Sequence, residues 1–149
     1  MDHVVYLDAK AKEFDSLLSA RKTMIIRGAA GRKLPHGRVN KDDILYFINN
    51  NAEGLILAKA KVKSVFNSDK MSEEESVQLV NGYQDKLQLT KQQFDRWAGK
   101  RYLVLIEVTE FEKVEAFQID KSSYGNMDDW LPVEQIDKVR IKNQSCLSG

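Results

Sequence analysis

The stretch of sequence that decides the fold is LLSARKTMIIR, residues 17–27. Before it, a short strand is expected at 4–7, and apolar residues recur at helical spacing over 9–20. Within it, the β-favouring run from Thr23 to Ile26 predicts a strand over 22–27, which Gly28 ends. The expected order is therefore strand, helix, strand, with Lys22 and Arg27 at the two ends of the second strand.

Positive charge is concentrated around this junction. No Asp or Glu occurs between positions 21 and 41, although the net charge of the chain is only +1. Lys and Arg release counterions when they contact phosphates, so a polyanion is the expected partner. A solvated basic loop would show the same pattern. The cations of this window are Arg21, Lys22, Arg27, Arg32, Lys33, Arg38 and Lys41.

The charge of the whole chain is divided unequally along its length. Residues 1–66 hold 12 Lys or Arg against 7 Asp or Glu, whereas residues 67–149 hold 11 against 15. This asymmetry predicts a molecule with a basic side and an acidic side.

Two strands and a turn are predicted after the basic window. The apolar run 44–48, the turn-forming residues 49–54 and a second run from Leu55 indicate a hairpin. In the second strand Lys59, Lys61 and Lys63 share one face, because side chains alternate across a strand. This face is a second candidate for binding a polyanion, and the alternative is a solvated face paired with carboxylates such as Glu107.

The second half of the chain contains helix signals followed by a long strand. SEEE at 72–75 and TKQQ at 90–93 match capping boxes, which predicts helices from there to about residue 83 and to about residue 99. Residues 101–117 suit a long strand that is buried on both faces at its start and central to the sheet. A last apolar pattern covers 133–141.

Length and composition indicate one domain. The 149 residues are sufficient for a single core, which we expect over 1–142, with a flexible tail at 143–149. The first residues lack the features of a secretory signal, and the apolar runs are far too short to span a bilayer, so we expect a cytoplasmic protein. A single cysteine, Cys146, agrees with a reducing compartment.

The motifs of several enzyme classes are missing. GAAGRK at 28–33 lacks the spacing and the Ser or Thr of a Walker A loop, and the two His residues have no Cys partners at metal-ligand spacing. We therefore expect no metal and no cofactor.

The helix-to-strand junction resembles the start of an ASCH domain, a family of the PUA-like superfamily. The family motif is Gly-x-Lys-x-x-Glu-x-Arg; Lys22 and Arg27 match it, whereas Ala20 stands at the Gly and Ile25 at the Glu. Residues 39–47 are similar to the family's Gly-Asp turn and following strand, with Asp42 at the usual Gly. The resemblance covers residues 1–66 by motif and the remainder by the order of elements.

The resemblance implies an α+β fold with a small, mixed, mostly antiparallel β-barrel flanked by three or more helices. It also implies a positively charged cleft near the motif that recognises RNA, a modified base or a nucleotide-like ligand. We therefore expect Lys22 and Arg27 to meet phosphate, with further attraction from the loop cations Arg32, Lys33 and Arg38. A Lys22 or Arg27 that is buried against a carboxylate would have a structural role instead.

Two aromatic residues are candidates for stacking on unpaired bases, because stacking on an aromatic face tolerates any base. They are Tyr46 and Trp130. Trp130 stands between an acidic pair and a proline, so the sequence allows it to be either exposed or buried. Trp97 follows Phe94 on one face of the predicted helix and is expected in the core.

Two other functions remain as alternatives. Some small ASCH proteins hydrolyse acetylated cytidine with a Lys, a Thr and a Glu, and in this chain Ile25 stands where the Thr is found. Thr23 is displaced along the strand, so we expect a binding module rather than an amidohydrolase. If the chain were a hydrolase of acylated nucleosides, Lys22 would be its base or nucleophile and Glu107 its partner. The third alternative is a protein-interaction domain that uses its acidic half.

Overall fold

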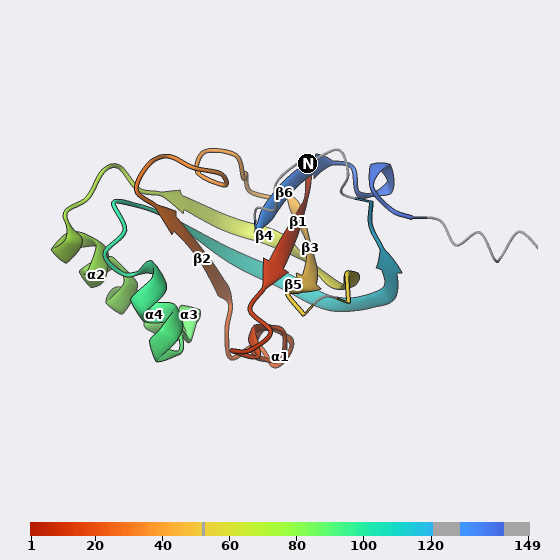
Figure 1. Cartoon of the computed structure of the whole chain (residues 1–149), viewed down its shortest axis with the longest axis horizontal. Helices are drawn as coiled ribbons and strands as arrows, with labels where there is room; N and C mark the ends of the chain where they lie inside the picture. The colour runs from red at the N-terminus through yellow and green to blue at the C-terminus, as the bar shows by residue number, and fades with distance from the viewer. Residues whose placement is uncertain (52, 121–128, 142–149) are drawn as a thin grey trace, which may run out of the picture.

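Six strands of the described chain form one curled half-barrel sheet, in the order β2-β5-β4-β3-β1-β6 (Figure 1). The computed structural model describes residues 1–51, 53–120 and 129–141. The strands are β1 (Asp2–Leu7), β2 (Met24–Ala29), β3 (Ile44–Asn49), β4 (Leu55–Asn67), β5 (Tyr102–Gln118) and β6 (Trp130–Glu134). The helices are α1 (Glu13–Leu18), α2 (Glu73–Gly82), α3 (Gln84–Leu87), α4 (Lys91–Trp97) and the short 3-10 helix η2 (Ile136–Lys138).

The pairing of the strands confirms the expected mixed, mostly antiparallel α+β fold. Only β1 and β3 are parallel among the described pairs, and every other pair is antiparallel. Strand β5 lies between β2 and β4, as its run of buried residues from Leu103 to Ile106 predicts. The sheet curls around a core, but within the described residues no ladder joins β2 to β6, so the barrel is open along one side.

The helices cover the sheet beside its β2 end (Figure 1). Helices α2, α3 and α4 pack there over Met24, Ile26 and Leu105 of β2 and β5. Both capping boxes are present, with Ser72 and Glu75 bonded reciprocally at α2 and Thr90 and Gln93 at α4. The two helix starts read from the sequence are therefore confirmed.

The first helix is shorter than expected. The apolar spacing predicted a helix over 9–20, but α1 spans Glu13–Leu18. The Asp8 carboxylate accepts a hydrogen bond from the Ala11 amide at 3.0 Å, and Lys12 has a left-handed conformation with φ of 55°. A turn closed by a side chain therefore replaces the first expected helical turn.

Two residues that depart from the family motif keep the backbone conformation of a glycine. Ala20 has φ of 63° and Asp42 has φ of 75°, and both stand where the motif has Gly. A side chain is disfavoured in this left-handed region, whereas Gly populates it readily. The agreement at both positions supports the alignment of this chain with the motif.

The site lies at the open side of the barrel. Strand β6 pairs with β1 only as far as Trp130 opposite Val5, and the next β1 amide, that of Tyr6, donates to the Asp129 carbonyl at 2.9 Å. The Tyr6 carbonyl accepts instead from the Arg27 guanidinium of β2, with Nη2 at 2.7 Å from the oxygen. We call this gap between β1 and β2 the seam. A side chain bridges the two strands there where a backbone ladder is missing.

Candidate functional site

Arg27 lies at the centre of the site. It shares a face of β2 with Ile25, which is part of the main core, so strand alternation points its side chain into the barrel at the seam. The residue is only 8% exposed, and its Nη1 and Nη2 donate to the backbone carbonyls of Ile26 and Tyr6, each at 2.7 Å. Among the described residues, no acceptor reaches its buried Nε.

Among residues 1–51, 53–120 and 129–141, no carboxylate makes a hydrogen bond or ion pair with the Arg27 guanidinium. Both hydrogen bonds that hold the guanidinium go to neutral carbonyl oxygens. Burial lowers the pKa of Arg27, while Glu13 and Asp129 act in the opposite direction from further away. An arginine stays protonated in proteins, so the seam holds a fixed positive charge with unused hydrogen-bond donors.

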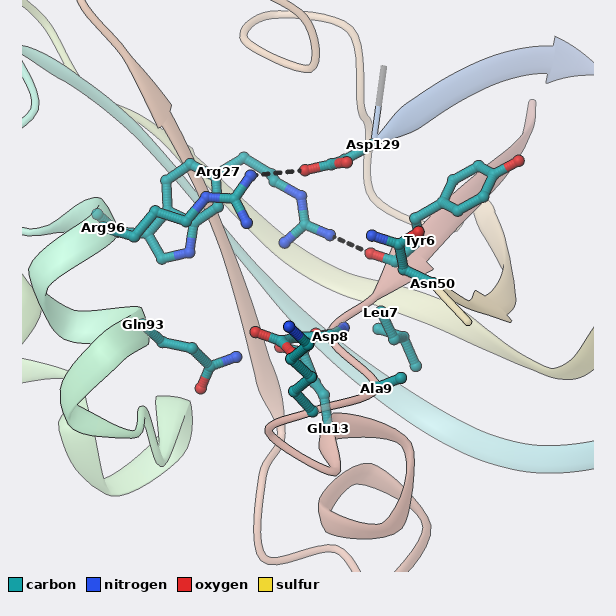
Figure 2. A pocket seen from close by; sticks show the side chains of 12 residues that line it. Tyr6, Leu7, Asp8, Ala9, Glu13, Arg27, Asn50, Gln93, Arg96 and Asp129 are labelled. Atoms are coloured by element: carbon teal, nitrogen blue, oxygen red, sulfur yellow. Dashed lines mark hydrogen bonds and ion pairs between the residues drawn. The ribbon is translucent and has the colours of Figure 1, made fainter. Parts of the chain in front are cut away.

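Two cavities of about 240 Å³ each adjoin at Arg27. We call the first the Glu13 chamber; it lies beside β1 and α4 and is shown in Figure 2. We call the second the Lys100 chamber; it lies toward Gly28 and Trp130. The residues that line both are Arg27, Arg96, Trp97 and Asp129.

An exposed ion pair lies between the two chambers. The Arg96 guanidinium reaches from α4 to the Asp129 carboxylate, with Nη2 at 3.1 Å from Oδ2 (Figure 2). It also stacks on the Trp97 ring, with Cζ at 4.4 Å from the centroid. Because both partners face solvent, this pair contributes little to stability. It contributes to the site by placing a cation and a carboxylate in the lining of both cavities.

Lys22 is not open to the cleft. Its side chain is 1% exposed, its Nζ lies 3.1 Å from Oε2 of Glu13, and it donates to the Leu87 carbonyl at 2.6 Å. Burial would raise the pKa of Glu13, but Lys22 and Arg27 outweigh this effect and hold the pKa below its ordinary value. Lys22 therefore has the buried, carboxylate-paired arrangement that indicates a structural role. Of the two residues, Glu13 is the one that lines a chamber, and its carboxylate is ionised.

Trp130 is buried, with 1% of its surface exposed. Of exposure and burial, which the sequence left open for this residue, the structure therefore shows burial. Its Nε1 donates to Nδ1 of His3 at 3.0 Å, and Nε2 of His3 lies 2.9 Å from the Asp43 carboxylate. Indole N–H is a donor only, so His3 accepts at Nδ1 and donates from Nε2. Trp97 and Trp130 each lie with their ring centroid 5.8 Å from the Arg27 Cζ. Both tryptophan rings therefore lie within cation–π range of the guanidinium.

The loop cations are divided among different surroundings. Arg32, Lys33 and Arg38 are all exposed, and Lys33 lines the Lys100 chamber. Arg32 lies over the Tyr102 ring, with Cζ at 5.6 Å from the centroid. The structure thus brings Arg27 and Lys33 together at one cavity.

The lysine face of β4 lies apart from that cavity. Lys59 pairs with Glu112 and Lys61 with Asp42, each at 3.5 Å, and both lysines line a separate hollow. Lys63 is exposed and acts on Glu107 only through its charge. The paired, solvated face considered for these lysines is therefore what the structure shows for Lys59 and Lys61.

The remaining candidates have other partners. Tyr46 packs edge-on against Phe117, and burial raises its pKa. Glu107 binds Lys86 at 3.0 Å and accepts from Ser64 at 3.3 Å. Burial would raise the pKa of Glu107, but the bond from Lys86 lowers it below the ordinary value.

Several lining residues carry no signal in the sequence. They come from four separate segments, and only the folded chain brings them to Arg27. A capping box identifies Gln93, but nothing in the sequence indicates that its side chain also faces a cavity. The residues missed in this way are Asp8, Lys10, Glu13, Asn50, Gln93, Arg96, Lys100 and Asp129.

No cluster of His, Cys, Asp or Glu that could hold a metal ion is found among residues 1–51, 53–120 and 129–141. Within the same residues, no helix is long and apolar enough to cross a membrane.

Comparison with known proteins adds information on the fold. No family model and no curated protein sequence matches the chain. Among solved structures, the ASCH protein of Zymomonas mobilis matches with a TM-score of 0.63 and 16% identity, over 92% of each chain. Two single-residue variants of that protein, a Tyr-to-Phe and a Ser-to-Ala substitution, match with the same score and identity over 92% of this chain. The chain therefore has an ASCH-like fold.

Proposed function

We propose that this protein binds RNA, or a nucleotide-like anionic ligand, in the cleft formed by the two chambers at Arg27. The observation that supports the proposal is a buried guanidinium whose hydrogen bonds, within the part of the chain that the structure describes, go to neutral carbonyls and not to a carboxylate. A buried charge without a partner is costly, and a phosphate oxygen is an acceptor that a guanidinium binds well. The cations around it, among them Lys10, Lys33, Arg96 and Lys100, would attract a polyanion to the same place.

The proposal differs in one respect from the expectation that the sequence raised. Lys22 would not meet phosphate directly, because Glu13 and the Leu87 carbonyl already occupy its ammonium. It would act by holding Glu13 in place at the wall of the chamber. Arg27 is then the residue of the motif that contacts the ligand.

The experiment measures the affinity for a short single-stranded RNA by fluorescence polarisation. The measurement is repeated at salt concentrations from about 50 to about 200 mM. We expect Arg27→Met to weaken binding at least about tenfold, the loss of one hydrogen-bonded charge. Arg38→Met is the matched control, since Arg38 belongs to the same basic window but lines neither chamber in the described structure. Unchanged affinity in Arg27→Met would remove the cleft from consideration.

Folding of the variants must be separated from binding. Arg96→Met serves this purpose, because the Arg96 side chain is 57% exposed and its loss leaves the core intact. It should weaken RNA binding about threefold to tenfold while circular dichroism and urea unfolding stay unchanged. Failure of the wild-type chain to bind RNA at physiological salt would favour the protein-interaction alternative.

Hydrolysis of an acylated nucleoside is a second candidate, favoured by one contact. The buried Lys22 and Glu13 lie 3.1 Å apart beside a cavity, which is an arrangement found at acid–base sites. Glu107, in contrast, is held by Lys86. Turnover of an acylated nucleoside that is kept in Glu107→Gln, and lost in Glu13→Gln under conditions where circular dichroism shows the variant folded, would establish this activity, and its absence over a substrate panel would remove it.

A further inference from the structure

The two chambers differ in charge although they share a wall. Four cations line the Lys100 chamber against the single carboxylate of Asp129, a formal charge of +3. Three cations and three carboxylates line the Glu13 chamber, so its formal charge is zero. An anionic group is therefore attracted to the Lys100 chamber and gains nothing from formal charge in the other. The cations of the Lys100 chamber are Arg27, Lys33, Arg96 and Lys100.

The Glu13 chamber offers both acceptors and donors of hydrogen bonds. Glu13 is an acceptor: its Oε1 already accepts from the Asp8 amide at 3.0 Å and its Oε2 lies 3.1 Å from Lys22 Nζ, and a carboxylate oxygen has a second lone pair for a ligand. The Oε1 of Gln93 accepts from the Thr90 amide at 3.1 Å, and this bond leaves the NH2 group of the same carboxamide facing the chamber (Figure 2). Asn50 adds an exposed carboxamide. Donors and acceptors placed side by side match the edge of a nucleobase, which alternates the same groups.

The size of the chambers favours one ligand that occupies both. Each holds about 240 Å³, which is below the range of about 300–1,000 Å³ for small-molecule sites, whereas the two together fall within it. The Arg96–Asp129 pair stands between them, and an exposed pair of this kind opens at little cost.

From these three observations we propose that the cleft binds a nucleoside monophosphate unit, with its phosphate in the Lys100 chamber and its base in the Glu13 chamber. This inference rests on the proposed function and adds to it the class of ligand and the direction in which the ligand lies. The guanidinium of Arg27, between the two chambers, would contact the link between sugar and phosphate.

The test uses probes that contain one part of the ligand each. They are the four ribonucleoside 5′-monophosphates, the corresponding nucleosides, and ribose 5-phosphate, measured by calorimetry with the full chain. The variants are Lys100→Ala and Asn50→Ala, both at exposed positions that line one chamber only. Lys91→Ala, an exposed lysine of α4 outside both chambers, is the control for Lys100→Ala.

The two variants should have reciprocal effects. Lys100→Ala should weaken the binding of the monophosphates and of ribose 5-phosphate about tenfold, as expected for loss of one charge-assisted contact. The affinity for the nucleosides should stay unchanged. Asn50→Ala should weaken the binding of the monophosphates and of the nucleosides about fivefold, and the affinity for ribose 5-phosphate should stay unchanged. Lys91→Ala should bind every probe as the wild-type chain does.

Two results would overturn the inference without touching the proposed function. One is an equal loss for all three kinds of probe in both variants. The other is ribose 5-phosphate binding as tightly as the monophosphates, since the base would then contribute nothing. In either case an RNA affinity that still depends on Arg27 would leave the cleft assignment standing, whereas RNA binding that is independent of Arg27 would end both.

Discussion

Replacing Glu13 by Gln should destabilise the protein strongly, because it removes one partner of a buried ion pair. The side chains of Lys22 and Glu13 are 1% and 4% exposed, so water cannot replace the lost carboxylate. Leaving a buried charge without its partner costs about 3–5 kcal/mol. For a domain of this size that corresponds to a fall in Tm of about 6–20 °C. The second change, Lys22→Met in the same chain, should recover most of the loss because no charge is left buried.

The assay is urea unfolding followed by the fluorescence of Trp97 and Trp130, both of which are buried in the folded state. Glu112→Gln provides the control, since it breaks the exposed pair with Lys59 and should change the free energy of unfolding by less than about 1 kcal/mol. A loss below about 1 kcal/mol in Glu13→Gln would show that water reaches the pair and that its burial has no energetic effect. A double variant no more stable than Glu13→Gln would show that the charge of Lys22 is not the cause.

Three further predictions concern other parts of the molecule. Burial lowers the pKa of His3, so the unfolded chain binds the extra proton first; stability should be full above about pH 6.5 and fall below it, with a flatter pH profile in His3→Gln. Ala20→Gly should stabilise the chain by up to about 1 kcal/mol in urea unfolding, because φ at this position is 63°. Gly28→Ala should destabilise it by about 1–3 kcal/mol, because the new Cβ would lie 2.6 Å from Leu103 Cδ2; an unchanged midpoint would show that Leu103 moves aside freely.

Most of the fold is predictable from local signals. Hydrophobic alternation, the two capping boxes and the turn residues at 49–54 specify strands and helices without reference to distant parts of the chain. The helix at 9–20 failed in part because Asp8 closes a turn with its own side chain, an effect that apolar spacing does not contain. The resemblance to the family motif singled out Arg27, and in the structure this residue lines both chambers.

The site is less predictable, because it depends on which sheet edges face each other across the seam. Asn50, Gln93 and Asp129 lie far apart in the sequence and have no shared pattern, so only the curled sheet and α4 bring them together. The role of Lys22 depends in the same way on Glu13, which sits at the start of a helix and has no motif of its own. Charge counts predicted the basic character of the region but not which cations are buried, paired or open.

The seam also has a consequence for motion. Across the seam, β2 and β1 are joined by core packing and by the Arg27 guanidinium, and among the described residues no backbone ladder pairs them. Breathing of the barrel should therefore concentrate at this line, and backbone amides of β2 and β1 that face it should exchange with deuterium faster than those of β4. A ligand lying across the seam would link β1 to β2 and slow that exchange. At a concentration a hundred times its Kd it would stabilise the folded chain by about 2.7 kcal/mol.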